Sequence, residues 1–280
     1  MKERTRASAA VSEIVRVAWW SLRALGCPLG AVEAMARVLV YSEVLDGQTL
    51  AALRRHERAL IAAFAEDPPR FDPTGDAGGT IDASRRSMLD IGPRAIDLVT
   101  GLAKRNGGVV RVTITRAADM IGLAGAATVA ARRNIGLVLI GGDTPRAWQF
   151  YAATRDGEIA SVAGEWNGSV DDVTATLRKL AGTSFPAITP SIDARDGGEV
   201  LLQLIAFPFV AASDFGADLS RREGVVCKNV TRALNHAYAH GVDVALDDLR
   251  FLYELETRTW APSSERSRMQ AGFQVAAPAA

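Results

Sequence analysis

The sequence predicts an α/β protein in which a helical N-terminal subdomain precedes a mixed-sheet α/β layer domain. The main observation is the stretch Met88–Gly142, which has the pattern of a helix, a strand from Val109, a glycine-punctuated segment, a helix and a second strand from Ile135. The second observation is a pair of apolar helical patterns before it. The third is the chain's 280 residues, 48% of them hydrophobic, which are enough to bury a large core.

The N-terminal helices follow from the spacing of their apolar residues. Positions 14–25 repeat with helical spacing until Gly26 and Pro28, and a second pattern over 31–42 breaks at Asp46-Gly47. A third helix is expected from Leu50 to Ala65. It is followed by EDPPRFDPTGDAGG, which we interpret as a connector. We therefore expect a helical hairpin and arm over residues 1–70 and an α/β domain with C-terminal helices over 71–280.

The second half of the chain predicts an edge hairpin, a buried strand and three helices. The alternation around Asp156-Gly157 indicates the hairpin, and a capping box from Ser169 opens the first helix. The apolar run Val200–Ala206, before Pro208, predicts a buried strand. Two helices are expected around Cys227–His240 and Leu246–Thr257.

Composition narrows the partners and the compartment. Lys plus Arg and Asp plus Glu are both 32, so the net charge of zero offers no field for nucleic acid or an anionic membrane. The first ten residues are charged and small, which is not a signal peptide, and no apolar run is long enough to span a bilayer. Two cysteines without a pairing pattern suit a reducing compartment. We expect a cytoplasmic protein that binds neither nucleic acid nor membrane.

One motif follows the second predicted helix. The stretch from Asp46 to Arg55 reads DGQTLAALRR and resembles a motif of the type 2 malate/L-lactate dehydrogenase family, Asp-Ser-His-Gly followed by Leu-Leu-Arg-Leu-Pro-Arg. In that family the histidine is the proton donor and the first arginine binds the substrate carboxylate. Gln48 replaces the histidine, and an amide cannot give up a proton near neutral pH. Ala52 replaces the arginine, so anchoring would pass to Arg54 or Arg55.

A second motif covers the glycine-punctuated segment. The family's Arg-Asn-Ser-x-His-Phe-Gly, continued by Gly-Tyr-Tyr toward a strand that ends in Thr-Asn, aligns with Arg116–Gly122, Gly125 and the strand end at Gly141. Met120 replaces the second histidine. Lys228 has the spacing of a lysine that opens a late helix in the family. The glycines could let a pyrophosphate approach the backbone closely. Alternatively, Gly122 and Gly125 allow close helix packing and Gly141 lies at a strand end.

The resemblance implies an NAD(P)-dependent oxidoreductase for a small anionic imine or a 2-keto/2-hydroxy acid, on a fold other than the Rossmann fold. It also implies a homodimer, which the apolar residues Trp19, Trp20, Val38 and Val40 favour. The site should lack a group that titrates near neutrality. The candidates are Asp46, Gln48 and Asp119 for catalysis; Arg54, Arg55, Arg116 and Met120 for substrate; and Gly122, Gly125, Gly141 and Lys228 for the cofactor. Two alternatives are a non-redox isomerase or lyase on this scaffold and a noncatalytic ligand-binding or partner subunit.

Two further patterns carry chemistry. RTWAPSSERSR near the C-terminus resembles the closing motif of an uncharacterised bacterial family, and its Ser264, Arg266 and Arg268 suit a carboxylate or phosphate. A helix cap with solvated arginines is the equal alternative. His236 and His240 have the i, i+4 spacing of zinc ligands, but no third ligand is evident, so we interpret them as histidines at a helix end and predict no metal site.

Overall fold

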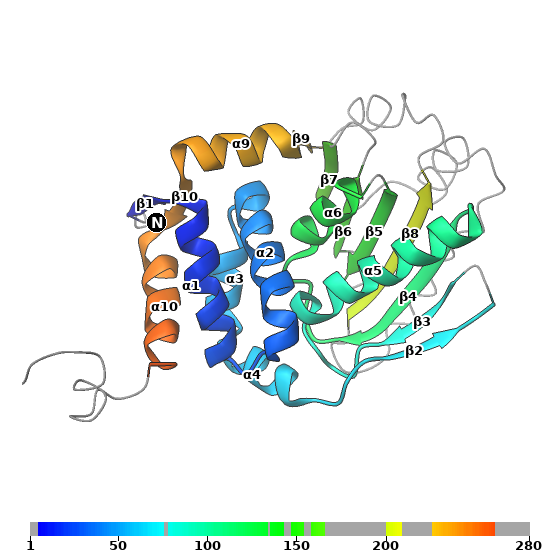
Figure 1. The fold of residues 1–280 in the computed structure, drawn as a ribbon, viewed down its shortest axis with the longest axis horizontal. Helices are drawn as coiled ribbons and strands as arrows, with labels where there is room; N and C mark the ends of the chain where they lie inside the picture. Colours follow the sequence, from blue (N-terminus) through cyan, green and yellow to red (C-terminus); the bar gives the residue numbers. More distant parts are fainter. Residues whose placement is uncertain are drawn as a thin grey trace, which may run out of the picture.

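The structure is a computed structural model that describes residues 5–75, 78–133, 135–142, 147–153, 158–165, 200–208 and 226–260. It has two parts that lie side by side, a large sheet with helices on it and a group of helices formed by both ends of the chain (Figure 1).

The sheet is mixed, as predicted, and the described residues contribute eight strands to it. Among these strands β3 and β4 pair in parallel, and the other neighbouring pairs within the described residues are antiparallel. β8 lies between β4 and β5, so the two strands of the predicted βαβ unit are parallel but not adjacent. In spatial order the strands are β2 (Arg70–Pro73), β3 (Gly78–Asp82), β4 (Val110–Ala117), β8 (Val200–Pro208), β5 (Ile135–Gly142), β6 (Ala147–Ala153), β7 (Glu158–Glu165) and β9 (Val226–Asn229).

Two helices cover the sheet and form the first core with it. They are α5 (Met88–Asn106) and α6 (Leu123–Ala131). α5 begins where the Ser87 hydroxyl accepts a hydrogen bond from the backbone N–H of Leu89, and it ends at Gly107 in the left-handed conformation. Alternate residues of β4 are buried, as expected for a strand with one face on a core. The shared core includes Ile96, Val99, Val112, Ile114 and Leu204.

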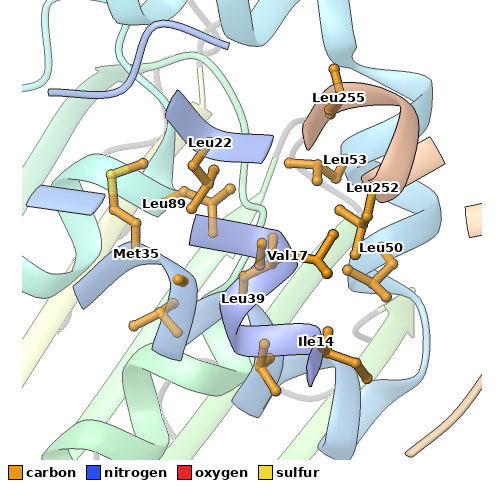
Figure 2. Packing of buried hydrophobic residues seen from close by; sticks show 14 of the residues in the cluster. Ile14, Val17, Leu22, Met35, Leu39, Leu50, Leu53, Leu89, Leu252 and Leu255 are labelled. Atoms are coloured by element: carbon orange, nitrogen blue, oxygen red, sulfur yellow. The ribbon is translucent and has the colours of Figure 1, made fainter. Parts of the chain in front are cut away.

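The second part is a helical layer that contains both ends of the described chain. It contains α1 (Val11–Ala24), α2 (Leu29–Asp46), α3 (Thr49–Arg55), α4 (Glu57–Ala65), α9 (Val230–His240) and α10 (Leu246–Thr257). α1 packs on α10, and β1 (Arg6–Ala9) pairs with β10 (Val242–Ala245). Figure 2 shows the resulting core, in which Ile14, Val17, Leu22, Leu39 and Leu252 meet.

α2 joins the two parts. It contacts α1 on one side and α5 and α6 on the other, so residues on several faces of the helix are buried, including the consecutive Val38, Leu39, Val40 and Tyr41. A helix segment that is apolar on all sides, as Val38–Tyr41 is, has to lie inside a protein, whereas the first half of α2 exposes Glu33 and Arg37. Packing on both sides therefore holds the end of α2 in place, and with it the turn that follows at Gly47.

Most predicted elements are confirmed, and three are corrected. The expected helix Leu50–Ala65 is two helices that divide at His56. The expected connector contains β2 and the start of β3, and Pro73 lies on the edge strand, where a missing N–H costs no ladder bond. The segment before Val230 is the strand β9 rather than the start of a helix. The Asp156-Gly157 turn and the helix from Ser169 lie outside the described residues, and no helix inside them is long and apolar enough to cross a bilayer.

Candidate functional site

The turn between α2 and α3 carries Asp46 and Gln48. Gly47 has a φ of 66°, which ends α2 in the left-handed conformation that glycine adopts without strain. The Asp46 carboxylate accepts hydrogen bonds from the backbone N–H of Gln48 at 2.9 Å and from the hydroxyl of Thr49 at 3.0 Å. Asp46 and Gln48 are both exposed. The turn is thus a rigid, solvent-facing corner that carries a carboxylate and an amide.

Lys228 reaches this corner from β9 at the edge of the sheet. Its ammonium group donates a hydrogen bond to the backbone carbonyl of Leu45, the residue before Asp46. Asp46 is exposed as a residue, but desolvation of its carboxyl group raises the pKa, while the bonds from Gln48 and Thr49 and the charge of Lys228 lower it. The structure therefore brings together Asp46, Gln48 and Lys228, which were predicted from segments about 180 residues apart.

A glutamate that was not predicted lies behind the turn. Glu43 is 4% exposed, and its carboxylate accepts a hydrogen bond from the backbone N–H of Leu50 at 2.8 Å. Burial raises the pKa of Glu43 to about 7, with a further contribution from the nearby carboxylates of Asp46 and Asp248, while the Leu50 bond lowers it. The expectation that no group here titrates near neutrality is wrong for this turn. The signal in the sequence was a glutamate close behind the apolar run Val38–Tyr41 of the same helix, since Glu43 follows Tyr41 and Ser42 directly.

The ends of β3 and β4 form a second polar region around Arg116. Its guanidinium makes a bidentate ion pair with the Asp82 carboxylate, in which Nε donates at 2.8 Å. The ion pair lowers the pKa of the Asp82 carboxyl. Ser84, Arg85 and Arg116 have φ values of 50°, 61° and 55°, which are uncommon for residues with side chains. Such strained backbone clusters at functional sites. The predicted substrate arginine is thus held by a neighbouring carboxylate on a strained loop pair.

Asp119 links two loops. Its carboxylate accepts hydrogen bonds from the Ser87 hydroxyl at 3.0 Å, from the Met88 N–H at 3.2 Å and from the Ile121 N–H at 3.0 Å. Burial raises the pKa of Asp119, these bonds lower it, and the charge of His56 also lowers it. Asp119 therefore fastens the start of α5 to the loop before α6, and its catalytic role stays a prediction. Met120 beside it is half-buried against the sheet core.

The two arginines of the first motif differ in their partners. Arg54 donates to the buried carboxylate of Asp248 at 2.6 Å and so ties α3 to α10. Arg55 is exposed at the end of α3. A carboxylate ligand would have to compete with Asp248 for Arg54, whereas Arg55 faces solvent.

Two of the three predicted cofactor glycines lie in close helix contacts. A Cβ at Gly125 would lie 2.0 Å from the carbonyl oxygen of Val38, and the Gly125 N–H already donates to the Ser42 hydroxyl at 2.6 Å. Gly122, with a φ of 90°, faces Val38 and Leu89 at 2.9 Å from its would-be Cβ. Gly141 pairs with Gln149 and Leu202 inside the sheet. The contacts of Gly122 and Gly125 are packing contacts between helices, and cofactor binding by the three glycines stays a prediction. Lys228 is the one charged residue among the predicted cofactor residues.

The structure adds less about the remaining candidate residues, the C-terminal Ser/Arg motif and the two histidines of α9. Ser264, Arg266 and Arg268 lie outside the described residues. The rings of His236 and His240 are 4.6 Å apart on α9, and the described part of the chain contains no group of three or more side chains that could hold a metal.

Comparison with known proteins gives a fold. No family model matches the sequence, and no curated protein matches it. Solved structures match over almost the whole chain. Malate dehydrogenase from Pyrococcus horikoshii OT3 has a TM-score of 0.62 at 13% identity and covers 94% of this chain and 99% of its own.

Two other solved structures agree with this. Sulfolactate dehydrogenase from Methanocaldococcus jannaschii has a TM-score of 0.57 at 13% identity and covers 89% of this chain and 96% of its own. Delta1-piperideine-2-carboxylate reductase from Pseudomonas syringae pvar. tomato has a TM-score of 0.58 at 14% identity, with 89% and 99% covered. The chain therefore has the fold of malate/lactate dehydrogenase-like proteins and related reductases.

Proposed function

We propose that the protein is a divergent NAD(P)-dependent oxidoreductase that acts on a small anionic imine or a 2-keto/2-hydroxy acid. The observation that carries the proposal is the junction of Lys228 with the turn of Asp46 and Gln48, in a chain that has the dehydrogenase fold over about nine-tenths of its length. Fold likeness at this identity does not by itself confer an activity, so the local chemistry has to support the proposal.

The groups at the turn suit an anionic ligand. Lys228 carries a positive charge at the exposed end of the α2–α3 corner, and its ammonium is a hydrogen-bond donor with three protons. Gln48 can donate and accept hydrogen bonds but cannot supply a proton. In this proposal the Lys228 ammonium gives one proton to the carbonyl oxygen or the imine nitrogen of the substrate, while the carbon of the same double bond would receive the hydride. Asp46 keeps the turn in place and balances the charge of Lys228.

A nicotinamide nucleotide, when bound, would supply the hydride. Lys228 would hold an anionic group of the nucleotide or of the substrate, because an ammonium pairs with phosphate and carboxylate alike. Gly122 and Gly125 take no part, since helix packing occupies the space and the Gly125 amide. The proposal thus depends on Lys228 rather than on a glycine cradle.

Nucleotide binding tests the proposal. We expect NADH or NADPH at millimolar concentration to raise the melting temperature of the wild type, because a ligand selective for the folded state stabilises it. Lys228→Met should lose most of this shift. Lys104→Met, at an exposed position near the end of α5, should keep it. No shift with either nucleotide contradicts the redox function.

A noncatalytic carboxylate-binding protein is the second candidate. The replacement of the motif's histidine by Gln48 and the occupied Gly125 amide favour it, because both remove parts that a reductase would use. In this case pyruvate or a cyclic imine carboxylate should stabilise the wild type without any nucleotide, and Lys228→Met should abolish the effect.

We also propose a homodimer in the cytoplasm. Val38 and Val40 are buried within the chain, so they cannot form the interface. Of the four predicted interface residues, Trp20 is the most exposed, at 41% on α1, and Trp19 lies edge-on beside it. Sedimentation should give a dimer for the wild type and a larger monomer fraction for Trp20→Ser. A wild-type monomer at micromolar concentration contradicts the proposal.

A further inference from the structure

A cavity of about 500 Å³ lies between α2, α5 and α6, apart from the α2–α3 turn. This volume is in the range of small-molecule sites. None of the candidate residues of the turn or of the strand ends lines it. Its apolar lining is Gly30, Ala34 and Val38 from α2, Pro93 from α5 and Val129 from α6.

The charged part of the lining has an excess of positive charge. Three guanidinium groups and two carboxylates line the cavity, so the net charge is +1. Arg37 is paired with Glu33 at 2.6 Å along α2, and Arg133 is paired with Asp97 across α5 and α6. The excess charge is that of Arg132, for which the described residues show no ion pair with a carboxylate.

Arg132 is held in place by Tyr41. Its guanidinium donates a hydrogen bond to the Tyr41 hydroxyl at 3.0 Å and lies 5.9 Å from the centre of the same ring. Tyr41 is 8% exposed, so the hydroxyl that holds Arg132 comes from a buried residue of α2. A guanidinium has five N–H donors, so this contact leaves donors for a ligand. An oriented guanidinium loses less entropy on binding a carboxylate.

We propose that this cavity binds a small organic carboxylate with an apolar body. The carboxylate is bound by the free donors of Arg132, which can make two parallel bonds to it. The apolar body packs against Ala34, Val38 and Val129, which would otherwise line a partly empty space. An anion without an apolar body would leave the apolar lining uncovered, and an apolar molecule without a charge would leave Arg132 without a carboxylate. The ligand therefore needs both a carboxylate and an apolar body.

Three probes separate the two requirements. Binding of 1-naphthoate, inorganic phosphate and 1-naphthalenemethanol is measured by isothermal titration on the full chain. We expect 1-naphthoate to bind at one site, with a dissociation constant at least about tenfold lower than that of phosphate or of the neutral alcohol. Phosphate that binds as tightly as 1-naphthoate overturns the apolar part of the proposal. An alcohol that binds as tightly overturns the role of Arg132.

Two variants locate the site. Arg132→Gln removes the charge and should weaken 1-naphthoate binding by at least about tenfold. Ala34→Trp, at an exposed position of α2, fills the cavity without a change of charge and should abolish binding. Arg58→Gln, at an exposed position of α4 outside the cavity, is the matched control and should bind like the wild type. Unchanged binding in Arg132→Gln or in Ala34→Trp, with melting temperatures that show folded protein, overturns the proposal, as does no binding to the wild type at millimolar concentration.

Discussion

The backbone N–H of Gly125 donates a hydrogen bond to the Ser42 hydroxyl at 2.6 Å, where α6 crosses α2. Ser42 is fully buried, so this bond satisfies a hydroxyl that has no access to water. The crossing is so close that a Cβ at Gly125 would lie 2.0 Å from the Val38 carbonyl oxygen. The contact fixes the helix that ends in the turn of Asp46 and Gln48 against the sheet part of the protein.

Gly125→Ala should therefore destabilise the protein strongly. The methyl group meets backbone rather than a flexible side chain, so the helices have to move apart, and we expect a loss of about 3 kcal/mol or more in the free energy of unfolding in urea. Gly101→Ala is the control, because this exposed α5 position has open space around it and should gain about 0.5–1 kcal/mol. Equal stability of Gly125→Ala and the wild type would contradict the packing role.

The sequence predicted the long periodic elements and missed the short nonlocal ones. α10 was predicted at its observed bounds because its apolar spacing extends over three turns. β1 and β10 have four residues each and pair across more than 230 positions, so neither shows a period, and only the tertiary structure joins them. The spacing of Gly122 and Gly125 in the sequence was compatible with cofactor contact and with helix packing alike. The Val38 contact, which gives Gly125 a packing role, lies 87 positions away.

The candidate site was predictable in part for the same reason. The motif located Asp46 and Gln48, and helix spacing pointed to Lys228, but their meeting at Leu45 depends on how β9 runs along the sheet edge. The pairing of Arg54 with Asp248 joins residues 194 positions apart and could not be seen in a local pattern. The pKa of Glu43 depends on burial, which one sequence does not report.

Glu43 should make stability fall as the pH rises toward neutrality. The folded-state pKa of about 7 lies above the ordinary 4.5, so the folded protein keeps a proton that the unfolded chain releases. This contribution to stability is fully present below about pH 4.5 and is lost as the pH rises to about 7, by up to about 1.4 kcal/mol per pH unit.

Urea denaturation between pH 4 and 8 measures this effect. Glu43→Gln should remove this part of the slope and be more stable than the wild type at pH 8, since an amide oxygen can still accept the bond from the Leu50 N–H. Glu33→Gln, on the same helix but exposed, should change stability by less than about 0.5 kcal/mol at any pH. Parallel pH profiles for the wild type and Glu43→Gln would contradict the burial argument.

Replacing Asp119 should lower the stability of the folded protein, whatever its effect on a reaction. Asp119→Ala leaves the backbone N–H groups of Met88 and Ile121 without their acceptor, so we expect a loss of about 2–3 kcal/mol in the free energy of unfolding. Asp72→Ala, on the exposed edge strand, should stay within about 0.5 kcal/mol of the wild type. A stable Asp119→Ala protein would show that the carboxylate does not hold the two loops together.

The Cys27 thiol should react only when the protein unfolds. It is completely buried between α1 and α2, with its sulfur 3.0 Å from that of Met35, and burial raises the pKa of the thiol to about 12. Since the thiolate is the nucleophile, burial and protonation both protect the group at pH 8. In a Cys227→Ser background, where Cys27 is the single thiol, a disulfide reagent should label native protein at the rate of unfolding and label it completely in urea. Rapid labelling of the native protein at pH 8 would mean that the α1–α2 corner opens without global unfolding.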